Sequence, residues 1–317
     1  MLTDTGESIE ADLFVDCTGA RSLLLGDFLN VPFISKKDML FTDTALATQV
    51  PNTSLDSPIA CSTIATAHQS GWIWDIGLST RRGVGLVYSS SHMSEEQAME
   101  ELTGYLNTSE LTQVKKINMK SGYHETFWQG NCVAIGMSQG FVEPLEATGL
   151  LMFDKSAQLL SELIAKQITE QQSFIPSSLA PHFNTTLRDV WDGVFDFIKL
   201  HYCLSTRSDS QFWRDHQDLS SCSENLATQL ERWRTNLPQQ SDFSSRPGVF
   251  NLANYLYVLF GMDVRPELPS FRNGAKDQTL SAKHHFAMQQ DLSALKPDLL
   301  SHRALLTRIQ KHGLHRI

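Results

Sequence analysis

Residues Gly130–Leu150, GNCVAIGMSQGFVEPLEATGL, decide the fold. The apolar run Cys132–Ile135 predicts a short buried strand. Gly136 and Gly140 permit a turn after it, and Pro144 predicts the first residue of a helix. A strand that passes through a glycine turn into a helix directs backbone N–H groups beyond the strand end. Proteins of the α/β class hold anions and cofactors in this way.

Glu146 falls in the first turn of this predicted helix, where the helix dipole would lower the pKa of its carboxyl. Spacing alone leaves two interpretations of the segment open. One is a binding site at the helix start, and the other is a capped crossover helix with a glutamate on the surface.

The same letters resemble the core motif of flavin-dependent tryptophan halogenases, which is close to N-x-V-x-x-G-x-x-x-G-F-x-E-P-L-E-S-T-G. A match of this length is specific. The resemblance covers most of residues 8–260, and the N-terminal part of the family has no counterpart in the chain.

Composition and charge set the broad class. Hydrophobic residues make up 41% of the 317 residues and charged residues 19%, as in a soluble globular protein. The net charge of −9 argues against nucleic acid as a partner. No apolar run approaches the ~20 residues that a membrane helix needs, so we expect no membrane association.

The cysteines and the N-terminal segment point to a reducing compartment. There are five cysteines, an odd number, and none is in a C-x-x-C pair. This pattern favours reduced cysteines and predicts no metal site. The first residues show no basic-then-apolar signal layout. We therefore expect a cytoplasmic protein.

A second motif begins at Asp16. Residues 11–15 predict a strand that ends in Asp16-Cys17-Thr18-Gly19. In flavin monooxygenase-like folds a strand that ends D-x-T/S-G lies close to the FAD, so the resemblance implies cofactor contacts from Asp16 and Gly19. No G-x-G-x-x-G follows a strand and opens a helix in these residues. We therefore interpret the chain as the C-terminal portion of a longer enzyme.

Residues 39–135 predict a large mixed or antiparallel sheet. Four runs there carry β-branched or aromatic residues between Pro, Gly, Asn or Arg breaks. Ser94 with Gln97 forms a predicted capping box for a helix over residues 94–106. The fold class is therefore α/β (α+β). Residues 1–175 are expected to form an incomplete flavin-monooxygenase-like FAD domain that contains this sheet.

Two tryptophans at alternate positions, Trp72 and Trp74, are predicted to share one face of a strand. They would either fill a core or form the wall of a planar ligand site. The family has W-x-W-x-I-P near the flavin, so the resemblance implies that both residues contact the cofactor. Gly77 replaces the proline of that pattern.

Helical periodicity dominates beyond residue 150. The segment from Pro176 to Pro181 is the predicted boundary of a helical substrate-binding subdomain, residues 176–317. Helices are expected up to residue 169, from Pro181 to about residue 202, and over residues 209–217, 221–236, 247–261, 281–293 and 298–312.

A third motif lies in this helical part, FIKLHYCLSTRSDSQFW, residues 197–213. By spacing it is a helix end, a polar turn and a new helix with aromatic anchors. The resemblance implies that His201, Tyr202, Phe212 and Trp213 line an aromatic substrate pocket. Ser208 stands where tryptophan-specific members carry a carboxylate for the substrate's amino group. Free tryptophan is therefore less well matched than another indole or a phenol.

The resemblance also implies a reaction and roles for residues. A separate flavin reductase supplies FADH2, and O2 and halide give hypohalous acid, which halogenates an aromatic small molecule. Glu146 is the expected catalytic and substrate-binding carboxylate. The backbone of Thr148 and Gly149 would hold the halide, and Met137 and Leu150 would contact the flavin. The family's catalytic lysine matches no lysine here.

These expectations combine into one hypothesis with two alternatives. The parent enzyme is expected to halogenate a tryptophan-like or indole-like aromatic, while the 317-residue chain alone is expected to be inactive. A flavin-dependent monooxygenase and a non-catalytic fragment that binds aromatics stay open, as does a homodimer.

Overall fold

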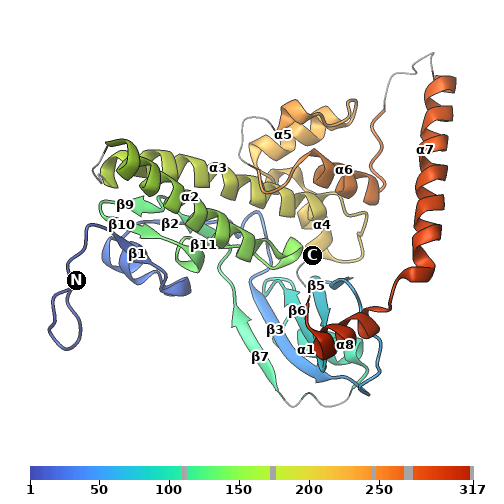
Figure 1. The fold of residues 1–317 in the computed structure, drawn as a ribbon, viewed down its shortest axis with the longest axis horizontal. Helices are drawn as coiled ribbons and strands as arrows, with labels where there is room; N and C mark the ends of the chain where they lie inside the picture. Colours follow the sequence, from blue (N-terminus) through green and yellow to red (C-terminus); the bar gives the residue numbers. More distant parts are fainter. Residues whose placement is uncertain (109–110, 112, 172–175, 244–247, 268–273, 315–317) are drawn as a thin grey trace. The chain divides into compact units, whose positions relative to one another are not determined.

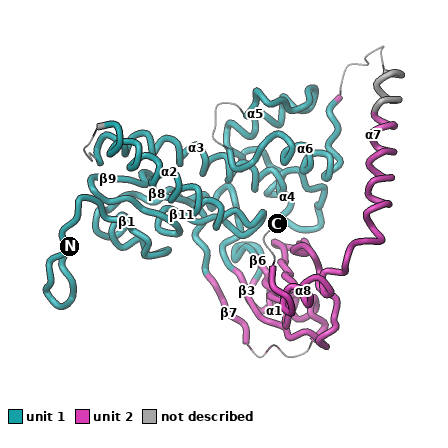
Figure 2. Tube along the Cα trace, viewed as in Figure 1, with its two compact units in different colours: residues 1–44, 88–93, 118–266 teal, residues 45–87, 94–117, 267–317 magenta. Residues whose placement is uncertain are grey.

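The computed structural model describes residues 1–108, 111, 113–171, 176–243, 248–267 and 274–314 (Figure 1). Contacts along the chain divide it into two compact units, which are coloured in Figure 2. Unit 1 comprises residues 1–44, 88–93 and 118–266, and unit 2 comprises residues 45–87, 94–117 and 267–317. The two units are described separately below.

Unit 1 contains two small sheets. In the first, β1 (Phe14–Asp16) pairs in parallel with β10 (Cys132–Ala134), which pairs antiparallel with β9 (Trp128–Gln129). In the second, β8 (Gly122–His124) lies between β2 (Phe33–Ser35) and β11 (Gly140–Phe141). The predicted strands before Asp16 and after Asn131 are thus confirmed, and the structure shows that they are neighbours in one sheet.

Helices make up the rest of unit 1, and α3 is the longest of those described (Figure 1). Helix α3 packs against α2 and against β9, and it buries residues from Phe183 to Tyr202. Its apolar positions recur at helical spacing, so one continuous face is removed from water. The bounds are α2 (Thr148–Gln171), α3 (Pro176–Cys203), α4 (Gln211–Gln217), α5 (Glu224–Trp233) and α6 (Leu252–Gly261). Short helical turns are η1 (Gly19–Arg21), η2 (Leu23–Phe28), η3 (Gly136–Ser138), η4 (Leu145–Ala147), η5 (Leu219–Ser221) and η6 (Gln240–Asp242).

Unit 2 is built on a five-stranded sheet in the order β4-β5-β6-β3-β7. Its helix α1 (Glu95–Leu106) begins with the predicted capping box of Ser94 and Gln97, and it buries Ala98 and Leu102. The strands are β3 (Thr44–Pro51), β4 (Ile64–His68), β5 (Gly71–Gly77), β6 (Arg81–Tyr88) and β7 (Val114–Asn118). The C-terminal helical segments are α7 (Gly274–Leu295), η7 (Lys296–Asp298) and α8 (His302–His312).

The fold is therefore mixed α/β with antiparallel pairing and a helical region, as the sequence predicts. The chain divides differently from the expected boundary at residues 175 and 176, because unit 1 contains both α3 and the sheet of β1. Pro181 lies inside α3, and the helix begins at Pro176, where the sequence predicts a linker. Proline fits the first turn of a helix because its missing N–H has no partner there in any case.

Pro144 is not the first residue of a helix, as the sequence predicts, but the residue before one. Leu145–Ala147 form a short helical turn, and α2 begins only at Thr148. Within that turn the backbone of Glu146 and Ala147 takes left-handed angles, with φ of 66° and 51°. Two such residues break the helical hydrogen-bond ladder, so Glu146 does not lie in the first turn of α2.

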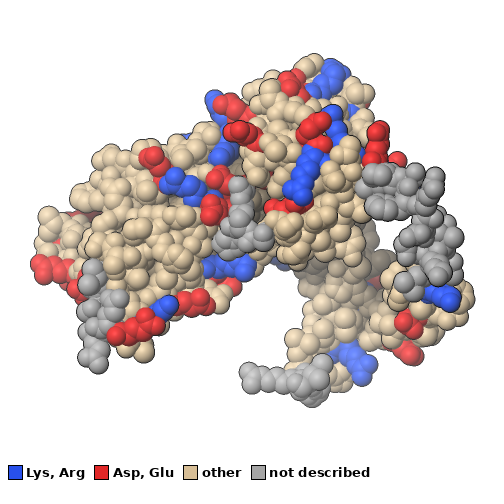
Figure 3. All heavy atoms as spheres, turned by 90° about the horizontal axis from the view of Figure 1, so that it is seen from above, with Lys and Arg blue, Asp and Glu red and all other residues tan. Residues whose placement is uncertain are grey.

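Acidic and basic side chains are mixed on the surface. On the face shown in Figure 3, Lys and Arg side chains lie singly or next to Asp and Glu. No group of three or more His, Cys, Asp or Glu residues within the described ranges could hold a metal ion. In those same ranges no helix has the length and apolar character to cross a bilayer.

Candidate functional site

The left-handed turn at Glu146 and Ala147 is the most unusual backbone in unit 1. A residue other than glycine in this conformation costs on the order of 1–3 kcal/mol, and such residues concentrate at binding and catalytic sites. The turn stops the short helix η4 and starts α2 in a new direction. Glu146 therefore lies just before the N-terminus of the 24-residue helix α2.

Glu146 is paired with His201 of α3. Its Oε1 lies 3.0 Å from His201 Nε2, while His201 Nδ1 lies 2.9 Å from the carbonyl oxygen of Phe197. Both ring nitrogens thus lie within hydrogen-bond distance of an oxygen atom, which fixes the orientation of the ring. The hydrogen bond from His201 lowers the pKa of the Glu146 carboxyl, against the opposing effect of burial. Glu146 keeps 38% of its side chain exposed, so it is reachable from solvent.

The first turn of α2 supplies the N–H groups of Thr148 and Gly149. The first four N–H groups of a helix have no partner inside the helix, and they attract anions. Thr148 is buried, and its hydroxyl oxygen is a buried polar atom without a hydrogen-bond partner in the described part of the chain. An unpartnered hydroxyl beside open N–H groups fits a bound halide.

Met137 and Leu150 flank this turn in the sequence and are exposed. Met137 is 40% and Leu150 is 80% accessible, which is high for large apolar side chains. A flavin that contacts both side chains, as expected, would therefore displace no residue of the core. Gly19 has a positive φ of 75°, and the space where its Cβ would lie is open. These three positions fit a flat, partly apolar cofactor such as FAD.

Asp16 has a structural task that the sequence does not reveal. Its buried carboxylate accepts hydrogen bonds from the N–H and hydroxyl of Thr18, at 3.0 and 2.6 Å, and from the N–H groups of Leu24 and Leu25, at 2.9 and 2.8 Å. Burial raises the pKa of this carboxyl, but the hydrogen bonds outweigh that effect and lower it. Asp16 therefore holds the turn after β1 and the start of η2, and its role at a cofactor stays a prediction.

Tyr202 and the two aromatic anchors form a packed group behind His201. The Tyr202 hydroxyl donates to Glu143, which also accepts from Thr42. The ring of Tyr202 lies 5.9 Å from those of both Phe212 and Trp213. Phe212 is fully buried and Trp213 is 5% exposed. The structure thus brings together the residues expected at the substrate, while their direct contact with it stays a prediction.

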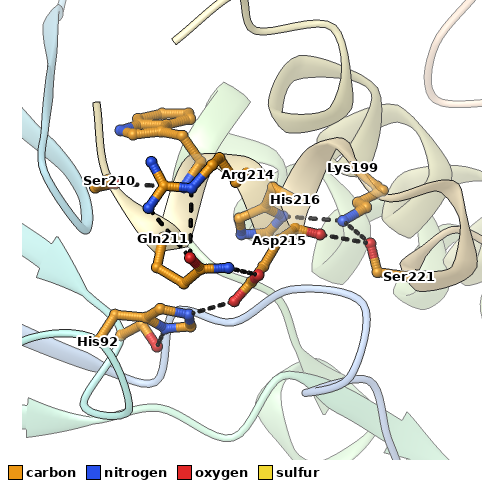
Figure 4. A network of polar contacts seen from close by, with 10 residues as sticks. His92, Lys199, Ser210, Gln211, Arg214, Asp215, His216 and Ser221 are labelled. Atoms are coloured by element: carbon orange, nitrogen blue, oxygen red, sulfur yellow. Dashed lines mark hydrogen bonds and ion pairs between the residues drawn. The ribbon is translucent and has the colours of Figure 1, made fainter. Parts of the chain in front are cut away.

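A buried polar network lies behind this aromatic group (Figure 4), and sequence analysis missed it. Lys199 Nζ lies 2.9 Å from His216 Nδ1 and donates to Ser221 Oγ at 2.8 Å. His216 stacks on Tyr202 with ring centroids 4.2 Å apart. Both Lys199 and His216 are fully buried, and burial lowers the pKa of Lys199 to about 8 and that of His216 to about 2. At neutral pH the Lys199 ammonium therefore donates to a neutral His216 ring.

A second chain of contacts joins this network to residues 88–93 of the same unit. His92 lies 2.8 Å from Ser89 Oγ and 2.9 Å from Asp215 Oδ2 (Figure 4). The histidine pairing lowers the pKa of Asp215. These contacts fix α4 and the loop before α1 in unit 1. The sequence signal for this network is Lys199, a lysine among the apolar residues of a predicted helix.

Trp72 and Trp74 lie in unit 2, on one face of β5 as predicted. Their rings are 6.2 Å apart, and Trp72 is buried while Trp74 is half-buried. A hollow of about 640 Å³ lies against Trp74, a volume that suits a ring-containing ligand. Whether these tryptophans contact a flavin stays a prediction. The hollow is lined by Ala47, Thr48, Gln49, Trp74, Gly83, Val84, Gln113, Val114 and Lys115.

Known proteins resemble this chain over most of its length. The family model described as tryptophan halogenase matches residues 1–277. The 7-chloro-L-tryptophan 6-halogenase KtzR of Kutzneria sp. (strain 744) is 34% identical over 303 residues, which cover 95% of this chain and 57% of that protein. The tryptophan 7-halogenase RebH of Lentzea aerocolonigenes is 34% identical over 284 residues, covering 85% of this chain and 52% of that protein.

Solved structures give the same result. The tryptophan halogenase of Shewanella frigidimarina NCIMB 400 superposes with a TM-score of 0.90 at 39% identity, covering 100% of this chain and 60% of that one. BrvH, a flavin-dependent halogenase from Brevundimonas sp. BAL3, superposes with a TM-score of 0.84 at 32% identity, covering 96% and 60%.

The family model and these relatives define the class, which is that of the flavin-dependent halogenases. The chain belongs to the tryptophan halogenase family. It spans 52–57% of the length of KtzR and RebH.

Proposed function

We propose that the site around Glu146 and Thr148 halogenates an electron-rich aromatic ring, with FADH2, O2 and halide as co-reactants. The observation that carries this proposal is the left-handed turn at residues 146–147. Because of this turn, the Glu146 carboxylate and the N–H groups at the start of α2 lie close together in the sequence and can bind different ligands. Family membership supports the same assignment.

Each residue has a distinct physical task in this proposal. When bound, FAD supplies the oxidising chemistry that converts halide into hypohalous acid. The N–H groups of Thr148 and Gly149 hold the halide, and the exposed side chains of Met137 and Leu150 cover the cofactor. Glu146 stabilises the positive charge that develops on the aromatic ring during attack. His201 orients that carboxylate through the 3.0 Å hydrogen bond.

The substrate class is inferred from the hydrogen bonds that the expected pocket residues already make within the protein. His201 bonds Glu146, and the Tyr202 hydroxyl bonds Glu143, so both are committed to protein partners. Arg207 and Asp209 pair with each other through two hydrogen bonds of 3.0 and 2.6 Å. Ser208 between them offers no carboxylate for an ammonium group. We therefore propose an indole or phenol without a free amino-acid group, and a separate flavin reductase as the supplier of FADH2.

The test uses a chimera with the Shewanella frigidimarina enzyme. The part of that enzyme that has no match in this chain is joined to residues 1–317, and the chain alone is assayed in parallel. Both receive reductase-supplied FADH2, bromide and a panel of indoles and phenols, and products are identified by mass spectrometry. The proposal expects a bromine isotope pattern from the chimera and no product from the chain alone.

Two outcomes would refute parts of the proposal. Hydroxylated products that form equally without bromide would assign the site to a monooxygenase. Bromination by the chain alone would overturn the expectation that these 317 residues are inactive by themselves. The unmodified Shewanella frigidimarina enzyme, assayed with tryptophan, verifies that flavin and bromide are supplied correctly.

A further inference from the structure

Two cysteines, Cys203 and Cys222, take no part in the proposed reaction. Cys203 is the last residue of α3, and Cys222 follows the short helix η5. Both are only partly buried, so a small molecule can reach them. Both also pack against one apolar cluster, which includes Leu200 and Leu226.

The two thiols lie in contact beside a buried cation. The thiol of Cys203 donates to the carbonyl oxygen of Leu200 at 3.5 Å, and it lies near enough to the Cys222 thiol for each to shift the pKa of the other. Lys199 lies four residues before Cys203 on α3, and therefore on the same face of the helix. Its Nζ donates to Ser221 Oγ at 2.8 Å, and Ser221 is the residue before Cys222. The charge of this one ammonium group therefore acts on both thiols.

Charge and hydrogen bonding give the two sulfur atoms different roles. The neighbouring Cys203 thiol, together with the Lys199 charge, lowers the pKa of Cys222, while burial opposes this change. The neighbouring Cys222 and burial raise the pKa of Cys203. Because the thiolate is the reactive form of cysteine, Cys222 is the nucleophile and Cys203 supplies the second thiol.

We propose that Cys203 and Cys222 form a redox modification site, in which a two-electron oxidant such as a peroxide or a hypohalous acid converts the pair into a disulfide. With hydrogen peroxide, the Cys222 thiolate attacks one oxygen and becomes a sulfenic acid, and hydroxide leaves. The Cys203 thiol then attacks that sulfur, the S–S bond forms, and water leaves. In total, two thiols lose two electrons and two protons, and one peroxide becomes two waters.

The bond would close a loop around residues expected at the substrate. Residues 204–221 lie between the two cysteines and include α4, which carries Phe212, Trp213 and His216. A disulfide removes conformational freedom from such a loop in the unfolded chain. Oxidation would therefore fasten α4 to the end of α3, directly after His201 and Tyr202.

The remaining cysteines are internal controls. Cys17 and Cys61 are exposed but have no thiol partner in the described structure. Cys132 is buried, and burial raises its pKa to about 11, so it should react slowly. If exposure alone determined oxidation, Cys17 and Cys61 would react first, and no bond between Cys203 and Cys222 would form.

Peptide mapping tests the proposal on the 317-residue chain. The reduced protein is treated with one equivalent of hydrogen peroxide, free thiols are blocked with iodoacetamide, and the protein is digested with trypsin without reductant. Trypsin places each cysteine on its own peptide, with Cys203 on residues 200–207 and Cys222 on residues 215–232. A parallel arm uses hypobromous acid, which distinguishes the two oxidant classes.

The proposal expects peptides 200–207 and 215–232 to be joined in a species that dithiothreitol separates. This species should exceed all other oxidised cysteine, and the Cys222→Ser variant should lack it. Oxidation of Cys17 or Cys61 without the joined species would overturn the proposal. Separate sulfinic acids at Cys203 and Cys222 would overturn it as well.

A lysine variant tests the role of the ammonium group. Lys199→Met should slow formation of the joined species about tenfold for each unit by which the pKa of Cys222 rises. Lys166→Met, at an exposed position on α2, is the matched control and should leave the rate unchanged. Because Lys199→Met removes a trypsin site, its Cys203 peptide covers residues 189–207. Should this variant fail to fold, the map of the unsubstituted chain still decides the proposal.

Discussion

Replacing Asp16 with asparagine should loosen the turn that follows β1. The buried carboxylate accepts four hydrogen bonds, two on each oxygen, from Thr18, Leu24 and Leu25. Asparagine has nearly the same shape but keeps only one acceptor oxygen. Its NH2 group would therefore face two donors, and two hydrogen bonds would be lost whichever way the amide is turned.

The size of the effect follows from these contacts. A hydrogen bond to a charged group contributes about 1.5–3 kcal/mol, so losing two of them costs about 3–6 kcal/mol. A single domain is stable by about 5–15 kcal/mol in total, so Asp16→Asn removes a large part of the margin. The loss should fall on the donors of Thr18 or on the N–H groups of Leu24 and Leu25, depending on which pair the amide NH2 group faces.

Amide hydrogen exchange, read at Thr18, Leu24 and Leu25, measures this loss locally. A cost of about 3 kcal/mol corresponds to a fall in protection of roughly a hundredfold. Asp12→Asn, at an exposed position on the same segment, is the control and should change little. Unchanged protection in Asp16→Asn would refute the assignment of Asp16 as the acceptor that holds this turn.

The contribution of Asp16 to folding stability should depend on pH in a predictable direction. The folded pKa of Asp16 lies below its ordinary value of 3.8, so its contribution is fully present above about pH 4. That contribution is lost as the pH falls through the lowered pKa. Urea melts of the unsubstituted chain should therefore lose stability in acid, and the Asp16→Asn variant should lose less.

Two further substitutions test the packing of each unit. In unit 2, a Cβ at Gly85 would overlap the Trp74 ring, whereas one at Gly83 would meet nothing within 4 Å. Gly85→Ala should cost about 1–3 kcal/mol and shift the tryptophan fluorescence, and an effect equal to that of Gly83→Ala would contradict this packing. In unit 1, Tyr202→Phe removes a hydrogen bond to the buried Glu143 and should cost about 2 kcal/mol in a urea melt. A loss below about 0.5 kcal/mol would show that this bond does not hold the aromatic group.

Local patterns in the sequence predicted most of the elements. The apolar run after Asn131 is confirmed as a buried strand, and the strand before Asp16 is confirmed too, because each pattern is local; their parallel pairing was not predicted. The capping box at Ser94 is confirmed, since both of its hydrogen bonds lie within four residues. Each of these features depends on residues that are close in the chain.

Features that depend on distant partners could not be predicted. The left-handed backbone at Glu146 accompanies a contact with His201, which lies 55 residues away. The position of His216 depends on Lys199 and Tyr202, from a different helix. No periodicity or propensity marks such contacts, because each of these residues is also common on helix surfaces. The family resemblance indicated the candidate site residues, and the structure shows their hydrogen-bond partners.

The amount of brominated product formed per FADH2 consumed, compared between the chimera and its Glu146→Gln variant, tests the proposed site most directly. Glutamine keeps the size of the side chain and removes the charge that is proposed to stabilise the ring during attack. We predict a fall of about 10²–10³-fold in brominated product, with FADH2 oxidation unchanged because halide is held by the backbone of Thr148 and Gly149. Equal product from both proteins would contradict the role of Glu146 and, with it, the proposed site.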